Sequence, residues 1–187
     1  MAFARTSLIG RALRQRRRGF LRDDLGATAV EVGLLAPVFF LIIGAILETA
    51  VVFLSSQVLD SAVHDASRLV RTGQVRTTTV ETFKTSVCDG LYGLFDCSKL
   101  HVEVQPLGTF SAANITPPVD YACKTAVECE KWTRNEAVDT GSTSAIMVAQ
   151  VYYRWPVILN FGGFTLANLS NGSRVLGSAT VFRNEPF

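Results

Sequence analysis

A continuous apolar run is the feature that most constrains this chain. It covers residues 32–54, and as a helix it would measure about 34 Å at roughly 1.5 Å per residue. The hydrocarbon core of a bilayer is roughly 30 Å thick, so the run is long enough to cross a membrane with some tilt. A secretory signal peptide has a shorter apolar region and a small-residue cleavage site beyond it, and neither fits well here. We therefore expect a transmembrane helix over residues 27–54.

The residues before this run are strongly basic. Residues 1–26 contain seven arginines and two aspartates, a net charge of +5, whereas the remaining residues carry 11 Lys and Arg against 14 Asp and Glu, or −3. Positively charged flanks stay in the cytoplasm, so we expect a basic cytoplasmic leader and a chain that lies outside beyond Leu54. Topogenic charge and attraction to anionic lipid explain the arginines, and no nucleic acid is needed as a partner.

The predicted helix has two further features. Pro37 lies inside the apolar run, and because a membrane helix tolerates a proline, we expect a helix kink at residues 39–41. Beyond the run, apolar residues recur every three or four positions among polar ones. This spacing predicts an amphipathic extension over residues 55–73 that ends at Gly73 as a C-cap.

Residues 74–187 predict a small α+β domain in which a helix packs on about three antiparallel strands. Thr78 and Glu81 have the spacing of a capping box at the start of a helix that runs towards Tyr92. Strands are predicted from alternating apolar and polar residues at 100–105, 144–153 and 174–182.

Local signals set the limits of these strands. The first is expected to be half-buried, with His101, Glu103 and Gln105 alternating with apolar residues, and to end at Pro106. Residues 106–141 are rich in Pro, Gly, Thr, Asn and charge, which predicts an irregular excursion between the first two strands. An Asn-Gly turn precedes the last strand.

Four cysteines lie in the predicted outer domain, where an oxidising compartment such as a bacterial periplasm would pair them. Cys88 and Cys97 are nine residues apart, and Cys123 and Cys129 are six apart. The sequence permits three connectivities, among which pairing of near neighbours is favoured. No Cys-x-x-Cys occurs and neither histidine is at ligand spacing to a cysteine, so disulfides are expected and a metal site is not.

Two carboxylates in the apolar helix are candidate functional residues. Glu31 lies at the inner end of the run, where an unpaired charge costs on the order of 2.5 to 3.5 kcal/mol, so it is expected to pair with a partner. The simpler alternative is an acidic residue stabilised by the helix dipole. Glu48 follows 17 residues later, about 26 Å along the axis. It is either a residue of the outer membrane edge or a partner contact.

The N-terminal residues carry a family resemblance. Gly26 followed by Ala27, with Glu31 as the fifth residue after that glycine and an apolar helix containing Pro37 and Glu48, resembles the TadE-like minor pilins, or pseudopilins. These belong to the tight-adherence (Flp, type IVc) pilus assembly system, within the wider class of type IV prepilins. The closing segment, residues 182–187, is similar to a terminal motif common in that family.

The resemblance implies a processing step and a subunit contact. A prepilin peptidase would cut on the cytoplasmic side between Gly26 and Ala27, and the Glu31 carboxylate would pair with the freed α-amino group of a neighbouring subunit. Glu48 is the second expected point of contact with another pilin. The other implied partners are inner-membrane pilus platform proteins and membrane lipid. The protein is expected to be single-pass in a bacterial inner membrane, with a cytoplasmic N-terminus and a periplasmic C-terminal domain.

The expected function is that of a minor pilin that helps to initiate or cap a tight-adherence pilus. One alternative is an uncleaved bitopic scaffold of the same machine, and another is a module that senses or binds an envelope ligand. The sequence has no nucleophile elbow, phosphate-binding loop or carboxylate pair tied to a pocket. Enzyme activity and a cofactor are therefore not expected.

Overall fold

The computed structural model describes residues 24–74, 78–161 and 163–186. It divides into two compact units, Met1–Ile46 and Leu47–Phe187. Helix α2 (Asp24–Arg71) contributes to both, and it has Pro37 inside it. Within the described residues α2 is the one helix long and apolar enough to span a membrane, and none of its most apolar stretch is buried. This is consistent with a membrane-anchored protein. The kink at Pro37 stays a prediction.

The C-terminal part of α2 is the central helix of the second unit. One face is buried, and Leu59 and Val63 at its centre have no exposed surface. The predicted end of the helix at Gly73 is confirmed: Gly73 has a φ of 67°, and its N–H donates to Val70 O at 3.0 Å while Gln74 N–H donates to Leu69 O at 3.1 Å. This is a Schellman motif, which needs a left-handed residue that glycine supplies without strain.

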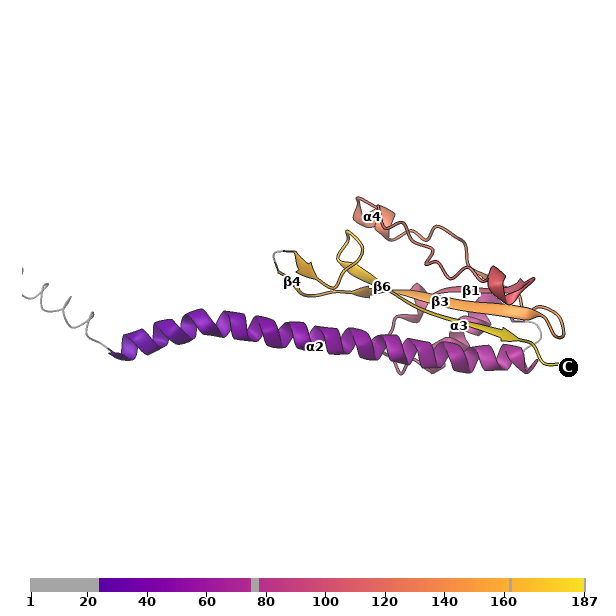
Figure 1. Cartoon of the computed structure of the whole chain (residues 1–187), viewed down its shortest axis with the longest axis horizontal. Coiled ribbons are helices and arrows are strands. Elements are labelled where there is room, and N and C mark those ends of the chain that lie inside the picture. The colour runs from indigo at the N-terminus through magenta and orange to yellow at the C-terminus, as the bar shows by residue number, and fades with distance from the viewer. Residues whose placement is uncertain (1–23, 75–77, 162, 187) are drawn as a thin grey trace, which may run out of the picture. The chain divides into compact units, whose positions relative to one another are not determined.

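A four-stranded sheet lies along this part of α2 (Figure 1). Its order is β2-β1-β3-β6, in which β1, β3 and β6 are antiparallel and the short β2 pairs with β1 in parallel. The strands are β1 (His101–Leu107), β2 (Ala137–Val138), β3 (Ile146–Pro156) and β6 (Ser173–Arg183). The predicted α+β fold with three antiparallel strands is confirmed, and β2 is an addition that its two residues did not signal.

The prediction that the first strand ends at Pro106 is wrong, because β1 continues to Leu107. Pro106 pairs with Met147 of β3, whereas β2 pairs only with Glu103 and Val104 on the other side of β1. On that other side β1 is a free edge at Pro106, and an edge is where a strand tolerates the missing N–H of proline.

Helix α3 (Val80–Asp89) packs beside α2 on the same face of the sheet. Its N-cap is Thr79, whose hydroxyl accepts from Thr82 N–H at 3.3 Å, so the predicted capping box of Thr78 and Glu81 is wrong by one residue. With Thr79 as the cap, Glu81 stands at the second helical position and cannot reach back as a capping-box glutamate does. Gly90 ends the helix, and a Cβ there would approach Ala62 of α2 to 2.9 Å.

The disulfides join near neighbours, the connectivity that the sequence favoured. Cys88 at the end of α3 is bonded to Cys97 at the start of the 3₁₀-helix η1 (Cys97–Lys99), and Cys123 is bonded to Cys129. The first disulfide fixes the entry into β1. The second closes a tight loop within the excursion.

The predicted excursion between β1 and β3 contains only short elements, η2 (Phe110–Ala112), α4 (Ala126–Cys129) and β2. A complete capping box begins α4: the Thr125 hydroxyl accepts from Glu128 N–H at 3.2 Å, and the Glu128 carboxylate accepts from Thr125 N–H at 3.3 Å. Its disulfide packs with Leu169 in a small second core. The excursion therefore shares a small core with Leu169 and Val175, which lie before and in β6.

The last residues of the chain tie β6 to the end of α2. Asn184 is buried, and its side-chain amide donates to Thr140 O at 2.9 Å and Ser142 O at 3.1 Å. Glu185 N–H donates to Arg71 O at 2.9 Å, and its carboxylate lies 3.5 Å from the Arg71 guanidinium. The backbone bond supplies a donor to one of the carbonyls that every helix leaves open at its C-terminus.

Candidate functional site

The predicted processing site lies in the first turn of α2, in the unit Met1–Ile46. Gly26 is exposed, and a Cβ built on it would meet nothing within 4 Å. The first turn of a helix has N–H groups without helical acceptors, and glycine lowers its stability by a further 0.5–1 kcal/mol or so, so this turn can open at low cost. Within the described residues no packing requires a glycine at position 26, and cleavage between Gly26 and Ala27 stays a prediction.

Glu31 lies two turns into α2 and is exposed. Its helical neighbours Val30, Val32, Leu34 and Leu35 are apolar and between 63% and 71% exposed. No hydrogen bond or ion pair engages the Glu31 carboxylate within the described part of the chain. The structure thus presents one carboxylate on an otherwise apolar helical surface, which is the arrangement that a pairing role requires.

Glu48 belongs to the other unit and has partners within the chain. Its carboxylate accepts from Ile158 N–H at 2.5 Å and from Leu159 N–H at 3.1 Å. These bonds join α2 to the segment that follows β3, a contact over 110 residues of sequence. This internal role of Glu48 was not predicted from the sequence. The predicted contact of Glu48 with a second pilin stays a prediction.

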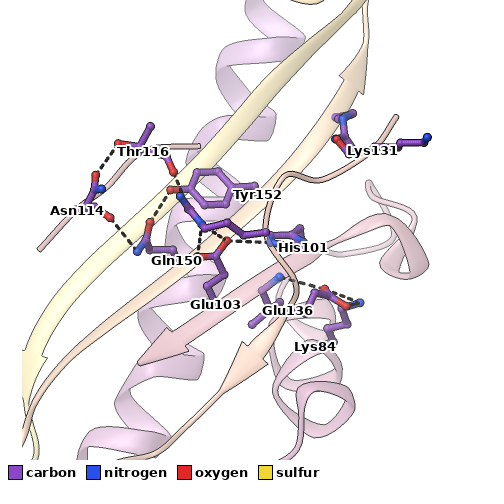
Figure 2. Close-up of polar contacts among 12 residues, drawn as sticks. Lys84, His101, Glu103, Asn114, Thr116, Lys131, Glu136, Gln150 and Tyr152 are labelled. Atoms are coloured by element: carbon purple, nitrogen blue, oxygen red, sulfur yellow. Dashed lines mark hydrogen bonds and ion pairs between the residues drawn. The ribbon is translucent and has the colours of Figure 1, made fainter. Parts of the chain in front are cut away.

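A buried polar cluster covers the face of the sheet that points away from α2 (Figure 2). Glu103 of β1 is 6% exposed and His101 is 1% exposed. The Glu103 carboxylate lies 2.9 Å from His101 Nε2 and accepts from Arg134 Nε at 3.0 Å. Arg134 also donates to Thr116 O at 2.7 Å. The positive charge of Arg134, whose side chain is 40% exposed, neutralises the negative charge of the buried Glu103 carboxylate.

Two more residues of this cluster come from β3. Tyr152 Oη donates to Gln150 Oε1 at 2.6 Å, and Gln150 Nε2 donates to Asn114 O at 3.2 Å. Burial raises the pKa of Tyr152 to about 12, so its hydroxyl stays protonated and remains a donor. Figure 2 shows Asn114 and Thr116 of the excursion meeting the sheet side chains here.

The surroundings of His101 favour its neutral form. Burial lowers its pKa, although the hydrogen bond to Glu103 acts in the opposite direction. The geometry agrees, because His101 Nδ1 is buried without a hydrogen-bond partner in the described residues, and protonation would leave an N–H there with no acceptor. With Nε2–H donating to Glu103, the neutral ring satisfies its one donor.

Trp132, a residue of the excursion, covers one side of this cluster. Its ring stacks on His101 with centroids 4.5 Å apart, and the Arg154 guanidinium carbon lies 3.5 Å from its ring centroid. Arg154 also donates to Lys131 O at 2.8 Å. Trp132, Arg154, Tyr153 and Lys99 contribute to the wall of an open groove of about 630 Å³.

None of the contacts in this cluster was predicted from the sequence. His101, Glu103 and Gln105 were expected on the less buried side of the first strand, but only Gln105 is exposed there. The cluster has a structural role: His101, Glu103 and Arg134 pair with one another and hold the excursion against the sheet. Among the described residues no group of three or more His, Cys, Asp and Glu is arranged to hold a metal ion.

Comparison with known proteins bears on α2. Residues 26–68 match the family described as TadE-like protein. The match begins at Gly26 and includes Glu31, Pro37 and Glu48, and it does not reach the closing segment, whose similarity to a terminal motif stays a prediction. Neither the curated proteins nor the solved structures gave a match. The resemblance read from the N-terminal residues is confirmed, and this chain is TadE-like over residues 26–68.

Proposed function

We propose that this protein is a minor pilin or pseudopilin that takes part, without enzymatic activity, in assembling a tight-adherence pilus. The TadE-like match supports a pilus-associated protein that interacts with other pilus components. In this proposal a prepilin peptidase removes residues 1–26 on the cytoplasmic side. The mature subunit stays in the inner membrane through α2 and presents the domain of Leu47–Phe187 to the periplasm.

The observation that carries the proposal is the Glu31 carboxylate on the apolar surface of α2. A helix that is apolar all round suits a lipid environment, whereas an isolated carboxylate in hydrocarbon does not. Cleavage after Gly26 creates an α-amino group at Ala27, a cation that lies about 6 Å from Glu31 along the helix axis. Pairing between the amine of one subunit and the carboxylate of the next removes the cost of leaving either charge unpaired in the membrane. It also fixes the axial position of one subunit against another.

The processing step is tested with two matched glycine variants. Gly26 and Gly33 are both exposed on α2, and a Cβ at either position meets nothing within 4 Å. Neither Gly26→Leu nor Gly33→Leu should therefore disturb the unit. Mass spectrometry of the protein from membranes of cells with a prepilin peptidase should show Ala27 as the first residue of the Gly33→Leu variant and the intact leader in the Gly26→Leu variant.

Two results would count against maturation. If the wild-type chain keeps residues 1–26 when the peptidase is present, the protein is better described as the uncleaved scaffold of the same machine. Normal processing of Gly26→Leu would show that the cleavage site lies elsewhere.

The pairing role is tested with Glu31→Gln against Glu48→Gln. Glu31→Gln keeps the shape of the side chain and removes its charge, so maturation should continue while cross-linking to other pilus components in membranes is lost. Glu48 has intramolecular partners, so Glu48→Gln should keep most of the cross-linking. Unchanged cross-linking and unchanged pilus formation in Glu31→Gln would remove the basis of the proposal.

The groove beside Trp132 favours one alternative, a module that binds an envelope ligand. It is about 630 Å³ in volume and is lined by Lys99 and Arg154 together with aromatic and hydroxyl groups. This alternative predicts that replacing Lys99 impairs function while maturation and pilus cross-linking stay normal. Lys99 is largely exposed, so Lys99→Ala should leave the fold intact.

A further inference from the structure

A small hairpin after β3 exposes apolar side chains that the domain does not use. It consists of β4 (Asn160–Phe161) and β5 (Phe164–Thr165), paired antiparallel. Phe164 and the preceding Ile158 are each 87% exposed, the highest values among the large apolar residues of the described chain. Residues 155–173, which contain the hairpin, include no Asp, Glu, Lys or Arg. Such a segment is costly to keep in water and easy to keep in contact with lipid.

The hairpin is attached to α2 at a residue inside the predicted membrane span. The Glu48 carboxylate accepts from the N–H groups of Ile158 and Leu159 at 2.5 and 3.1 Å. Where little water is present, a carboxylate and a backbone N–H group both need hydrogen-bond partners. Here the Glu48 carboxylate and the two N–H groups are partners for each other. The contact thus satisfies the backbone at the base of the hairpin and the one charge in this part of the helix.

The position of Glu48 sets the depth of the hairpin. Glu48 lies six residues before Leu54, the end of the apolar run, which is about 9 Å along the helix axis. Interfacial protein segments bury their apolar side chains roughly 5–10 Å into the boundary between headgroups and acyl chains. A hairpin bonded to α2 at Glu48 therefore lies at the level of this boundary when α2 spans the membrane.

The surface next to the hairpin combines the groups that a phospholipid would contact. A groove of about 370 Å³ runs between α2 and β6, with apolar walls that include Val52, Phe53 and Leu166. Arg174 also lines it and is anchored by a hydrogen bond of 2.9 Å from Nη1 to Leu166 O. A fixed guanidinium beside apolar side chains suits a phosphate headgroup above an acyl chain.

We propose that the hairpin of β4 and β5, through its exposed Phe164 and the preceding Ile158, is a second membrane contact of this protein and inserts into the periplasmic leaflet of the bilayer that α2 crosses. The partner is the phospholipid surface, because the hydrogen bonds of Glu48 hold the start of the hairpin segment against the helix that is expected to span the membrane. The inference rests on α2 spanning a membrane, and it does not depend on cleavage or on pilus assembly.

The test measures quenching of tryptophan fluorescence by brominated lipid. The full-length chain is reconstituted in vesicles of phosphatidylethanolamine and phosphatidylglycerol with bromine on the acyl chains. The variant is Phe164→Trp, and the matched control is Phe110→Trp. Phe110 is also an exposed phenylalanine, at 57%, and it lies just after the Leu107 end of β1, at the opposite end of the sheet from Pro156. Trp132 and Trp155 give the same background in both variants.

The expected result is a loss of fluorescence from the introduced tryptophan in Phe164→Trp and none from that in Phe110→Trp. Equal quenching of both variants in vesicles that carry the protein would overturn the hairpin contact and leave the membrane anchor intact. Quenching that is absent in vesicles, with Phe164→Trp emission shifting only as protein concentration rises, would assign the surface to a second copy instead. A chain that fails to float with the vesicles would overturn the contact and the membrane anchor together, whereas failure of maturation in cells would affect only the proposed function.

Discussion

The two ends of α2 differ in their share of apolar residues and in their surroundings: residues 24–47 contain 17 apolar residues, and residues 48–71 contain 12. Towards the N-terminus the apolar side chains point in all directions and are exposed, as Leu34 and Phe40 are at 71% and 67%. Towards the C-terminus they form one stripe, and Leu59 and Val63 are completely buried against the sheet. A helix that is apolar all round suits lipid, and a helix with one apolar stripe suits a protein core. One continuous helix therefore serves as an anchor at one end and as part of a globular core at the other.

The largest expected effect separates the two ends directly. Leu59→Ala leaves a cavity in a packed core and should lower the free energy of unfolding of the domain by about 2–5 kcal/mol. Leu34→Ala removes a similar side chain from an exposed surface and should leave that free energy unchanged. Both values come from denaturant unfolding of the full chain in detergent micelles, followed by near-ultraviolet circular dichroism. Equal losses in the two variants would show that the exposed end is also part of the folded core.

A second prediction asks whether the domain can weaken while the anchor persists. Replacing both Cys88 and Cys97 by Ser should cost the domain about 2–3 kcal/mol, near the lower end for a native disulfide because the closed loop is short. Flotation with lipid vesicles should not change, because the exposed end of α2 lies outside the loop. The measurements are urea unfolding and vesicle flotation of the same preparation. If flotation falls together with stability, the anchor depends on the domain fold and the comparison fails.

The smallest expected effect is a pH dependence confined to the domain. Burial lowers the pKa of His101 below its ordinary value of 6.5, so the unfolded chain takes up a proton in a range where the folded chain does not. The stabilisation is complete above about pH 6.5 and is lost as pH falls below that value, with a slope of at most about 1.4 kcal/mol per pH unit for one proton. Urea unfolding between pH 7.5 and 5.5 measures this slope.

The matched variant for this pH effect is His101→Gln, which keeps a donor for Glu103 and cannot titrate. It should reduce the slope while its stability at pH 7.5 changes less than that of Leu59→Ala. The charged groups that face His101 are Glu103 and Arg134, with Glu136 nearby. A slope unaffected by His101→Gln would assign the pH dependence to another group.

Much of the fold was predictable because it follows from local chemistry. The end of α2 at Gly73 requires only a glycine after a periodic apolar stripe, and the three antiparallel strands follow from alternation. The errors arose where a distant segment changes the environment. Pro106 is tolerated in β1 because β2, about thirty residues later in the chain, pairs only with Glu103 and Val104 and needs no N–H group from position 106. Alternation in residues 100–105 suggested a more open face, but the excursion covers that face and turns His101 and Glu103 into core residues.

The candidate site divides in the same way. Gly26, Glu31 and Pro37 could be proposed from the sequence alone, because the roles proposed for them depend on their spacing in one helix; the family match covers all three positions, and their roles stay predictions. The partners of Glu48 were not predictable, since Ile158 and Leu159 lie more than a hundred residues away and bond through backbone groups that any sequence possesses. The connectivity of the cysteines was open for a similar reason, and only the fold selects among the three arrangements.

The position of Trp132 gives this protein a built-in optical signal. The indole is in contact with the imidazole of His101 and the guanidinium of Arg154, and both contacts exist only while residues 106–141 cover the sheet. The other tryptophan, Trp155, packs with Phe95 in the core beneath the sheet. Detachment of the cover would alter the emission of one indole and spare the other, so unmodified protein can reveal opening of this segment separately from unfolding of the domain.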